Sequence, residues 1–343
     1  MRHLLNTLFV TSEDIYLSLD GENVVASREK ETVARYPLHT LTAILTFAYP
    51  GASPALMGAC AQRGISLSFC TPRGKFLARV TGEANGNVLL RRTQYRMADD
   101  PVQSCGIARA MVFGKVHNAR WSIERTRRDH GLRVDDQRLG EVSSQLKTML
   151  SQLLQETDLD SLRGVEGASA AAYFGVFDQM ILGDRSVFHF ETRSRRPPLD
   201  PVNALLSFAY SLLSHDCAGA LESVGLDSYV GFLHRDRPGR SSLALDLMEE
   251  FRPCMADRFV LTCINNRIFQ KTDFVYRENG GVLLSESGRR TFLQRWQERK
   301  KGSLTHPFLG EKVPWGLVPY LQALLLARFL RGDLEAYPPF LWK

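Results

Sequence analysis

The N-terminal part of the chain alternates apolar and polar residues with a period of two, which is typical of half-buried β-strands. Residues 14–19 alternate in this way, residues 20–21 supply a turn, and residues 23–26 return as the second strand of a hairpin. We expect further strands within the opening residues MRHLLNTLFVTSED and at 41–47, 65–69 and 76–80. A short helix at 53–62, with Ser53 as its N-cap, completes a small β-rich domain.

From residue 88 onward the apolar residues recur every three or four positions, which is the spacing of amphipathic helices. The segments with this spacing are 88–97, 102–124, 141–156, 167–182, 202–213, 242–251, 256–265, 288–298 and 320–330. Two acids and a proline at 99–101 fit a linker, so we place a domain boundary there. The predicted fold class is α+β, with a small N-terminal β-rich domain, residues 1–97, followed by a larger all-α C-terminal domain, residues 98–343.

The composition fits a soluble globular protein of two domains, with 343 residues and 44% hydrophobic side chains. The longest apolar runs, 204–213 and 318–330, are shorter than the roughly 18–20 residues that span a bilayer, so we expect no membrane partner. The start of the chain lacks the small-residue cleavage site of a signal peptide. The six cysteines form no Cys-x-x-Cys pair, which predicts reduced, buried thiols and a cytoplasmic protein.

The net charge of +6 is modest, but the basic residues, arginines above all, are concentrated in three segments. These segments are 115–128, 185–196 and 289–301. Arginine binds phosphate groups in a bidentate geometry, so the three segments favour a polyanionic partner, most simply nucleic acid. Such binding should depend on salt concentration and show little sequence preference. The alternative for any one segment is an ordinary solvated helix face.

The stretch GFLHRDRPGRSSLALDLMEEFRP, residues 231–253, combines one histidine, His234, with a helical pattern that has an apolar face. On a helical wheel Asp246, Glu249 and Glu250 share the opposite face. Three acids so close repel one another, and neighbouring arginines or a metal ion would relieve that repulsion.

A further acid, Glu166, lies in the stretch RGVEGASAAAYFGVF, residues 163–177. Both it and His234 have ordinary structural explanations, since acids favour the N-terminus of a helix and a lone histidine is more often structural. Taken together, two carboxylates and one imidazole suit Mg²⁺ or Mn²⁺ rather than zinc held by thiolates. An ion of this kind beside arginine-rich segments indicates phosphodiester chemistry.

Three stretches of the chain match a known family. They are GVEGASAAAYF at 164–174, RRPPLDPVNALLSFAYSLL at 195–213, and the stretch 231–253 quoted above. With these stretches in this order, the chain resembles over nearly its whole length the CRISPR-associated integrases, metal-dependent DNases that insert new spacers into CRISPR arrays. The resemblance implies an N-terminal β domain that joins a homodimer and a C-terminal α domain that holds the active site.

By position in those stretches, the resemblance implies that Glu166, His234 and Glu249 are the catalytic residues and the ligands of Mg²⁺ or Mn²⁺. Many members of the family have aspartate at the position of Glu249, so Asp246 and Glu250 stay alternatives for the third ligand. Asp246 is also a candidate auxiliary acid. The arginines expected to bind DNA are Arg193, Arg195, Arg196, Arg235, Arg237, Arg240, Arg252, Arg289 and Arg290.

The reaction that the resemblance implies is a transesterification, in which a 3′-hydroxyl of a spacer duplex attacks a phosphodiester at the edge of a CRISPR repeat. With water as the nucleophile, the same site would cut DNA. Asn203 would help to hold the metal ligands in position without binding the metal ion itself, although helix packing explains the presence of this residue equally well. The implied partners are the spacer and repeat DNA, a second copy of the chain, and the small ferredoxin-like adaptation protein of CRISPR systems, which would bridge two dimers.

The sequence alone leaves three other classes of protein to consider. A structure-selective nuclease that cuts branched repair intermediates would use the same ligands, but it would shorten strands without joining them. In a non-catalytic DNA-binding scaffold the same residues would only complete a core. A helical carboxylate–histidine redox enzyme would need a second histidine at Glu-x-x-His spacing, and none follows Glu166 or Glu249 at that interval.

Overall fold

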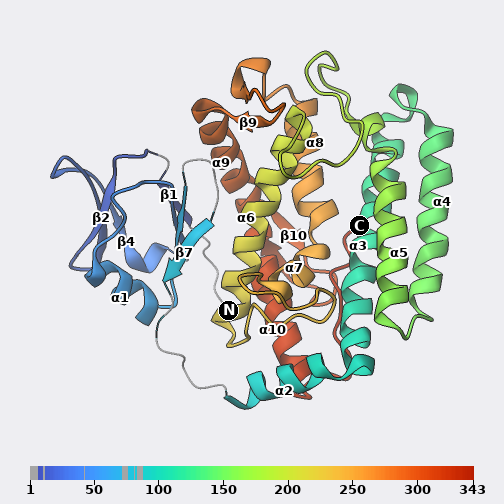
Figure 1. Ribbon diagram of the computed structural model, residues 1–343, viewed down its shortest axis with the longest axis horizontal. Helices are drawn as coiled ribbons and strands as arrows, with labels where there is room; N and C mark the ends of the chain where they lie inside the picture. The colour runs from blue at the N-terminus through green and yellow to red at the C-terminus, as the bar shows by residue number, and fades with distance from the viewer. Residues whose placement is uncertain (1–6, 11, 42, 72–75, 81, 83–87) are drawn as a thin grey trace. The chain divides into compact units, whose positions relative to one another are not determined.

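The computed structural model describes residues 7–343 except residues 11, 42, 72–75, 81 and 83–87 (Figure 1). The chain divides into two compact units. The first, called the β unit here, comprises the residues up to Gly86 together with Arg289–Leu304 and Val313–Leu317. The second, the helical unit, comprises Asn87–Gly288, Thr305–Lys312 and Val318–Lys343. N-terminal strands followed by a mostly helical region confirm the predicted α+β fold class.

The N-terminal residues of the β unit form strands and one helix. Their bounds are β1 (Thr7–Val10), β2 (Tyr16–Asp20), β3 (Asn23–Arg28), β4 (Glu31–Pro37), β5 (Ala43–Thr46), α1 (Pro54–Gln62), β6 (Ser66–Cys70) and β7 (Phe76–Val80). A four-stranded sheet has the order β1-β5-β6-β7, in which β1, β5 and β6 are parallel and β7 is antiparallel to β6. The three-stranded sheet β2-β3-β4 is antiparallel.

One apolar core is shared by both sheets and α1. Leu17 and Val24 of the three-stranded sheet are fully buried, as is Leu56 of α1. Ile44 and Leu67 of the four-stranded sheet are at most 1% exposed. Burying each of these side chains contributes about 1.5–3 kcal/mol relative to leaving it in water. The apolar positions that predicted the strands are therefore the ones that build the core.

The sequence pattern predicted each of these elements except β4. Strand β4 pairs with β3 along its length, but most of its side chains are exposed, so it shows no apolar alternation. Ser53 caps α1 as expected, because its hydroxyl accepts a hydrogen bond from the N–H of Leu56 at 3.2 Å. The expected hairpin turn at 72–74 lies outside the described residues.

The rest of the chain is mainly helical. The helix bounds are α2 (Val88–Asp99), α3 (Pro101–His130), α4 (Asp136–Leu153), α5 (Leu159–Phe174), α6 (Pro201–Ser223), α7 (Ser242–Glu249), α8 (Arg258–Asn265), α9 (Glu286–Lys301) and α10 (Val318–Leu330). A π-helix, η4 (Arg252–Asp257), lies between α7 and α8. Short 3-10 helices are η1 (Leu38–Thr40), η2 (Gly131–Arg133), η3 (Phe177–Met180), η5 (Lys271–Asp273) and η6 (Trp315–Leu317). The expectation of an all-α C-terminal region was wrong in one respect, since β8 (Phe274–Tyr276) pairs with β9 (Val282–Leu284) and β10 (Ser303–Thr305) with β11 (Lys312–Pro314).

The structure places the boundary between units elsewhere than the sequence pattern did. Residues 97 and 98 lie inside α2, and the unit boundary falls after Gly86. Asp100 is the N-cap of α3, whose side chain accepts hydrogen bonds from the N–H groups of Val102 at 2.9 Å and Gln103 at 3.1 Å. Residues 99–101, which the sequence pattern predicts to be a linker between domains, therefore form the junction between helices α2 and α3.

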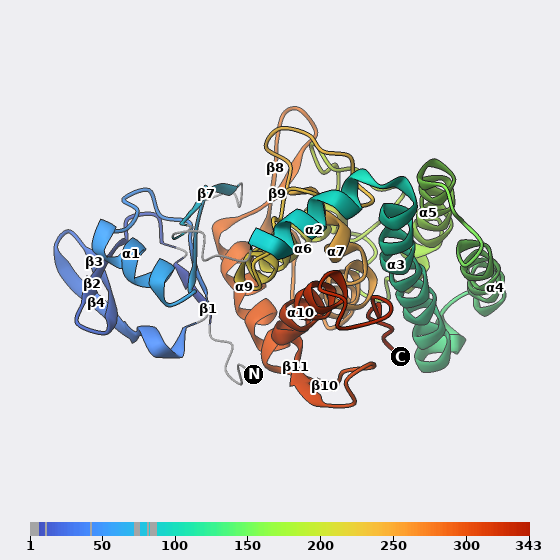
Figure 2. The same cartoon turned by 90° about the horizontal axis from the view of Figure 1, so that it is seen from below.

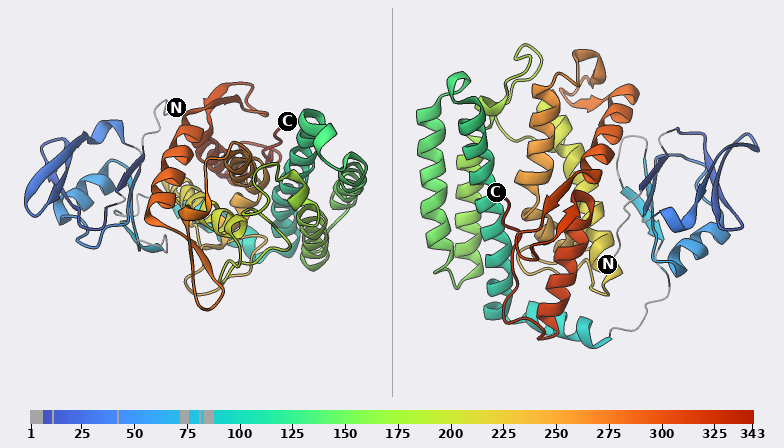
Figure 3. Two further views of the ribbon diagram at one scale, coloured as in Figure 1. Left: turned by 90° about the horizontal axis from the view of Figure 1, so that it is seen from above. Right: turned by 180° about the vertical axis from the view of Figure 1, so that it is seen from behind.

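Helix α3 connects two groups of helices within the helical unit. It packs on α4 and α5, and the three run alongside one another in Figures 1 and 3. It also contacts α7 and η4, while α6 packs on α7 and α10. The C-terminal residues lie beside α3, as Figure 2 shows, and the N–H of Trp342 donates to Oδ1 of Asn118 at 2.8 Å. Over the residues that the structure describes, none of the helices has the length and apolar character needed to cross a membrane.

Candidate active site

A cavity of about 440 Å³ in the helical unit gathers residues from α3, α5, α7 and the loop before α7. Its lining is mostly basic, and consists of Lys115, Asp160, Arg163, Glu166, Arg195, Leu233, His234, Arg235, Arg237, Arg240, Glu249 and Arg252. The three residues that the sequence predicted as metal ligands, Glu166, His234 and Glu249, therefore face one cavity. Its many arginines suit a ligand that carries phosphate groups.

Glu166 lies in the middle of α5, which begins earlier than the sequence pattern predicted. Asp158 caps this helix by accepting a hydrogen bond from the N–H of Ser161 at 2.8 Å. The helix dipole acts mainly within the first turn, so it does not explain an acid at position 166. The carboxylate of Glu166 instead forms an ion pair with the ammonium of Lys115 on α3.

Glu249, the last residue of α7, has a side chain that is only 4% exposed. Its carboxylate lies 2.7 Å from Nζ of Lys115 and 3.2 Å from the guanidinium of Arg252. Burial alone would raise the pKa of Glu249, but Arg252, Lys115 and His234 together lower that pKa to about 2. The carboxylate is therefore ionised near neutral pH, as metal ligation requires.

Lys115 reaches both acids because α3 passes very close to α7 one residue earlier, at Gly114. A Cβ atom at Gly114 would lie 3.2 Å from Cγ of Glu250 and 3.3 Å from Cβ of Pro339. Glycine leaves this close approach undisturbed, whereas the Cβ of any other residue would force the side chains of Glu250 and Pro339 to shift by a few tenths of an ångström. The approach brings the next side chain of α3, that of Lys115, to Glu249.

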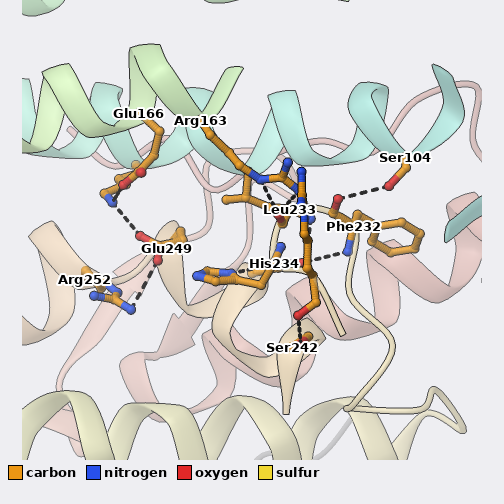
Figure 4. Close-up of polar contacts among 12 residues, drawn as sticks. Ser104, Arg163, Glu166, Phe232, Leu233, His234, Ser242, Glu249 and Arg252 are labelled. Carbon is orange, nitrogen blue, oxygen red and sulfur yellow. Dashed lines mark hydrogen bonds and ion pairs between the residues drawn. The ribbon is translucent and has the colours of Figure 1, made fainter. Parts of the chain in front are cut away.

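His234 is oriented by Asp246, whose side chain is fully buried. The imidazole Nδ1 lies 2.5 Å from Oδ1 of Asp246. The same carboxylate accepts hydrogen bonds from the N–H groups of Phe232 at 2.6 Å, Leu233 at 2.9 Å and His234 at 3.0 Å. With Nδ1–H held by a carboxylate, the lone pair of Nε2 is left for a metal ion. Figure 4 shows the imidazole pointing toward the carboxylate of Glu249.

Two further helices hold the loop that carries His234 (Figure 4). Oγ of Ser104, on α3, donates to the carbonyl oxygen of Phe232 at 3.0 Å. The guanidinium of Arg163, on α5, donates twice to the carbonyl oxygen of Leu233, at 2.7 and 3.0 Å. With the contacts from Asp246 on α7, the loop is fixed to three helices, and two of them carry a predicted ligand.

The acids at positions 246, 249 and 250 do not form one ligand face, contrary to the interpretation of the helical wheel. Asp246 binds the loop before α7 and is not part of the cavity lining, whereas Glu249 faces the cavity. Glu250 is fully buried on another side and accepts hydrogen bonds from the hydroxyl of Tyr337 and the N–H of Phe340, both at 2.6 Å. The geometry therefore favours Glu249 over its two neighbours as the third ligand.

Replacing Glu250 with glutamine is expected to remove a loss of stability that the wild-type protein shows as the pH rises. Burial raises the pKa of Glu250 from 4.5 to about 8, against the opposite effects of Tyr337, Phe340 and Gln322. The folded protein keeps a proton that the unfolded chain releases in this range, so the free energy of unfolding falls from pH 4.5 up to about pH 8. Because one pKa unit corresponds to about 1.4 kcal/mol, the loss should reach several kcal/mol. Denaturant unfolding at both ends of this range checks the prediction, and an equal loss in the two proteins would contradict it.

Arg252, beside Glu249, is fixed by a residue of α6. Its guanidinium lies 4.8 Å from the centre of the Tyr210 ring, whose hydroxyl donates to Asp257 at 2.5 Å. Arg252 and Asp257 are five residues apart in the π-helix η4, so they lie on the same side of it. Burial raises the pKa of Asp257 to about 6, while Tyr210 and Arg252 act in the opposite direction. The π-helix therefore positions Arg252 between Glu249 and an aromatic ring.

Arg193, which the sequence predicted to bind DNA, has partners inside the helical unit. Its guanidinium donates to Oδ1 of Asn203 at 2.6 Å and to Oγ of Ser207 at 3.0 Å, and it lies 5.2 Å from the Tyr210 ring centre. Asn203 is fully buried, and its amide also donates to the carbonyl oxygen of Thr192 at 2.8 Å. Arg193 and Asn203 thus fix the segment before α6, and neither lines the cavity.

The other arginines expected to bind DNA lie in different places. Those that line the cavity and are not described above are Arg195, Arg235, Arg237 and Arg240. Arg252 also lines it, but its side chain is 13% exposed and paired with Glu249. Arg196 is exposed and is not part of the lining, and Arg289 and Arg290 lie on α9, in the β unit.

The donor set fits a hard to borderline divalent ion such as Mg²⁺ or Mn²⁺. As the side chains stand, no three histidine, cysteine or acidic groups within the described part of the chain are close enough together to hold a metal ion. The cation shared by Glu166 and Glu249 is instead the Lys115 ammonium. The two carboxylates thus already direct oxygen atoms at one positive charge, and His234 supplies a nitrogen from the same cavity.

Comparison with known proteins identifies the family of this chain. The model of a family described as CRISPR associated protein Cas1 matches residues 8–298. A CRISPR-associated endonuclease Cas1 from Chlorobaculum tepidum is 48% identical over 343 residues, which is 100% of both chains. A casposase bound to integration product has the same fold, with a TM-score of 0.83 and 22% identity over 99% of this chain and 95% of that one. So does a chain of a Cas6-RT-Cas1–Cas2 complex, with a TM-score of 0.79 and 23% identity over 100% of this chain and 36% of that one. The chain therefore belongs to the Cas1 family of CRISPR-associated proteins.

Proposed function

We propose that the protein is a divalent-metal-dependent DNA nuclease and integrase, which inserts spacer DNA into a CRISPR repeat array. The observation that carries this proposal is the cavity, in which Glu166, His234 and Glu249 face a space lined with arginines. Carboxylates and imidazole suit a divalent ion, and arginines suit the phosphates of DNA. Membership of the Cas1 family and the endonuclease name of the 48% identical relative support the same activity.

The two carboxylates and Nε2 of His234 would hold Mg²⁺ or Mn²⁺. Such an ion, when bound, activates the attacking oxygen and offsets negative charge on the leaving oxygen. Asp246 keeps the proton of His234 on Nδ1 and so keeps Nε2 available as a ligand. Arg163 holds the backbone of the same loop at Leu233, which preserves the distance between the imidazole and α5.

The arginines of the cavity would position the substrate. Arg195, Arg235 and Arg237 would bind phosphate oxygens and hold one phosphodiester of the repeat beside the 3′-hydroxyl of the spacer. The 3′-hydroxyl loses its proton to solvent as its oxygen bonds to phosphorus, and the displaced 3′-oxygen of the repeat-bearing strand leaves on the opposite side and takes up a proton from solvent. One phosphodiester is exchanged for another, whereas attack by water yields a cut strand.

The proposed assembly contains DNA, a homodimer joined through the β units, and the small ferredoxin-like adaptation protein that the family resemblance implies. A solved complex named for both Cas1 and Cas2 contains a chain with this fold, which supports a partner of that kind. The proposed partner would bridge two homodimers, so that two cavities act on the two ends of one spacer duplex.

An integration assay tests the proposal. The protein is incubated with a labelled duplex that has free 3′-hydroxyls and a supercoiled plasmid that carries a CRISPR repeat, in Mn²⁺, Mg²⁺ or EDTA. We expect label to be joined to the plasmid only with a metal ion. Joining should be lost in Glu166→Ala, because one of the two carboxylates is gone, and kept in Glu141→Ala, which removes an exposed acid of α4.

Each of the other outcomes of this assay would argue for a different function or a different active site. Cutting without joining, even with the adaptation protein added, would favour the structure-selective repair nuclease. Salt-dependent DNA binding with neither activity would favour the non-catalytic scaffold. Joining that persists in Glu166→Ala would show that the reaction takes place at another site.

A further inference from the structure

Lys115 places one positive charge between two acids of the candidate active site. Its ammonium forms an ion pair with Glu166 and lies 2.7 Å from the carboxylate of Glu249. The side chains of Lys115 and Glu249 are 12% and 4% exposed, so water screens this contact poorly. A buried carboxylate needs such a partner, because an unpaired buried charge is strongly destabilising.

The contacts of Lys115 compete with those that a metal ion would make. A divalent ion held by Glu166 and Glu249 needs oxygen atoms that now face the ammonium. Two cations on one pair of carboxylates would also repel each other strongly at this low exposure. Lysine suits an exchange of partners, because its ammonium is a point charge on a long, flexible stem.

We propose that Lys115 is an internal counter-cation that neutralises Glu166 and Glu249 in the metal-free protein and is displaced when a divalent ion binds. This inference rests on the metal-dependent function proposed above. It assigns control over the affinity for the divalent ion to Lys115, which is not one of the proposed metal ligands. Lys115 lowers the affinity of the free protein for the ion and, in exchange, keeps the two acids paired while no ion is present.

The cavity also indicates where the displaced ammonium goes. Besides Glu166 and Glu249, the only acid in the cavity lining formed by the described residues is Asp160. Asp160 already pairs with Arg163 at 2.6 Å and Arg235 at 3.2 Å. A phosphate of bound DNA supplies a new acceptor for Lys115. Binding of DNA and binding of the metal ion should therefore favour each other, with Lys115 as the side chain that couples them.

Titration of Mn²⁺ into the full-length protein without DNA tests the proposal. We expect Lys115→Met to bind Mn²⁺ about tenfold or more tightly than the wild type, since the competing cation is gone. Its metal-free form should melt at a lower temperature, and Mn²⁺ should raise that temperature more than in the wild type. Lys147→Met, which removes an exposed lysine of α4 and the same net charge, should resemble the wild type in both measurements. A short duplex should tighten Mn²⁺ binding more in the wild type than in Lys115→Met.

The outcomes separate this inference from the proposed function. Equal or weaker Mn²⁺ binding by Lys115→Met, while the wild type binds, would overturn the role of Lys115 alone. If the wild type binds no Mn²⁺ with or without DNA, the metal-dependent function itself fails. Should Lys115→Met not fold, amine labelling of the wild type followed by mass spectrometry gives the answer. Mn²⁺ should increase labelling of Lys115 relative to Lys147, and unchanged or reduced labelling would overturn the proposal.

Discussion

Replacing Glu249 with glutamine is expected to lower metal-dependent cutting and joining of DNA by about 10³-fold or more, which is about 4 kcal/mol of transition-state stabilisation. The carboxylate faces the cavity and is held ionised by Arg252 and Lys115. An amide has no charge to offer a metal ion, and only one of its two polar atoms is an acceptor. Initial rates at several Mn²⁺ concentrations check the prediction, because a lost ligand lowers both the rate and the affinity for the ion.

The neighbouring acid provides a matched control. Glu250→Gln makes the same chemical change one residue later, but that side chain contacts Tyr337 and Phe340 instead of the cavity. We expect this variant to keep activity within about threefold of the wild type, since no ligand changes. Equal losses in the two variants would mean that helix α7 as a whole has been disturbed, and the assignment of Glu249 would then lack support. Thermal unfolding of both variants distinguishes these cases.

Replacing Asp246 with asparagine should also be damaging, though less so than Glu249→Gln, because this side chain lies outside the cavity lining and acts through His234. Its carboxylate accepts hydrogen bonds from three backbone N–H groups and lies 2.5 Å from Nδ1 of His234. An amide would turn an NH₂ group toward some of these donors and leave at least one of them unsatisfied, at about 1–3 kcal/mol each. Loss of an outer partner of a metal-bound histidine typically costs about 10- to 100-fold in metal affinity or activity.

The measurements for Asp246→Asn are Mn²⁺ affinity, DNA-joining rate and melting temperature. Asp236→Asn is the control, because Asp236 is an exposed acid on the same loop. All three quantities should fall in the first variant and stay near wild type in the second. Unchanged metal affinity in Asp246→Asn would show that the orientation of His234 does not depend on this carboxylate.

The sequence predicted a large part of this structure because the relevant signals are local. Strands β1–β3 and β5–β7 and helices α1–α10 follow from apolar spacing, and Ser53 was identified as a cap from residue type alone. The apolar pattern did not predict strand β4, because most side chains of this strand are exposed and burial therefore does not alternate along it. It also failed at residues 289–304 and 313–317, whose placement in the β unit depends on contacts between distant parts of the chain.

For the candidate site, the sequence indicated the ligands but not their surroundings. The helical wheel placed Asp246, Glu249 and Glu250 on one face, yet each acid has different partners on other elements. Lys115 was only one member of a basic segment, because nothing in α3 itself shows that it meets α5 and α7. Arg163 is three residues before Glu166, and helical spacing alone could have suggested that it lies on the same face.

The position of the C-terminal residues has a consequence for how the chain folds during synthesis. The side chain of Asn118 bonds to the backbone of Phe340 and Trp342, which are 222 and 224 residues later in the chain. A ribosome adds residues from the N-terminus, so α3 emerges long before the segment that satisfies this buried amide. Until then the surface of α3 and α7 around Asn118 and Glu250 stays exposed to water and to other nascent chains. We therefore expect the helical unit to need protection from aggregation, for example by a chaperone, until residues 337–342 have left the ribosome.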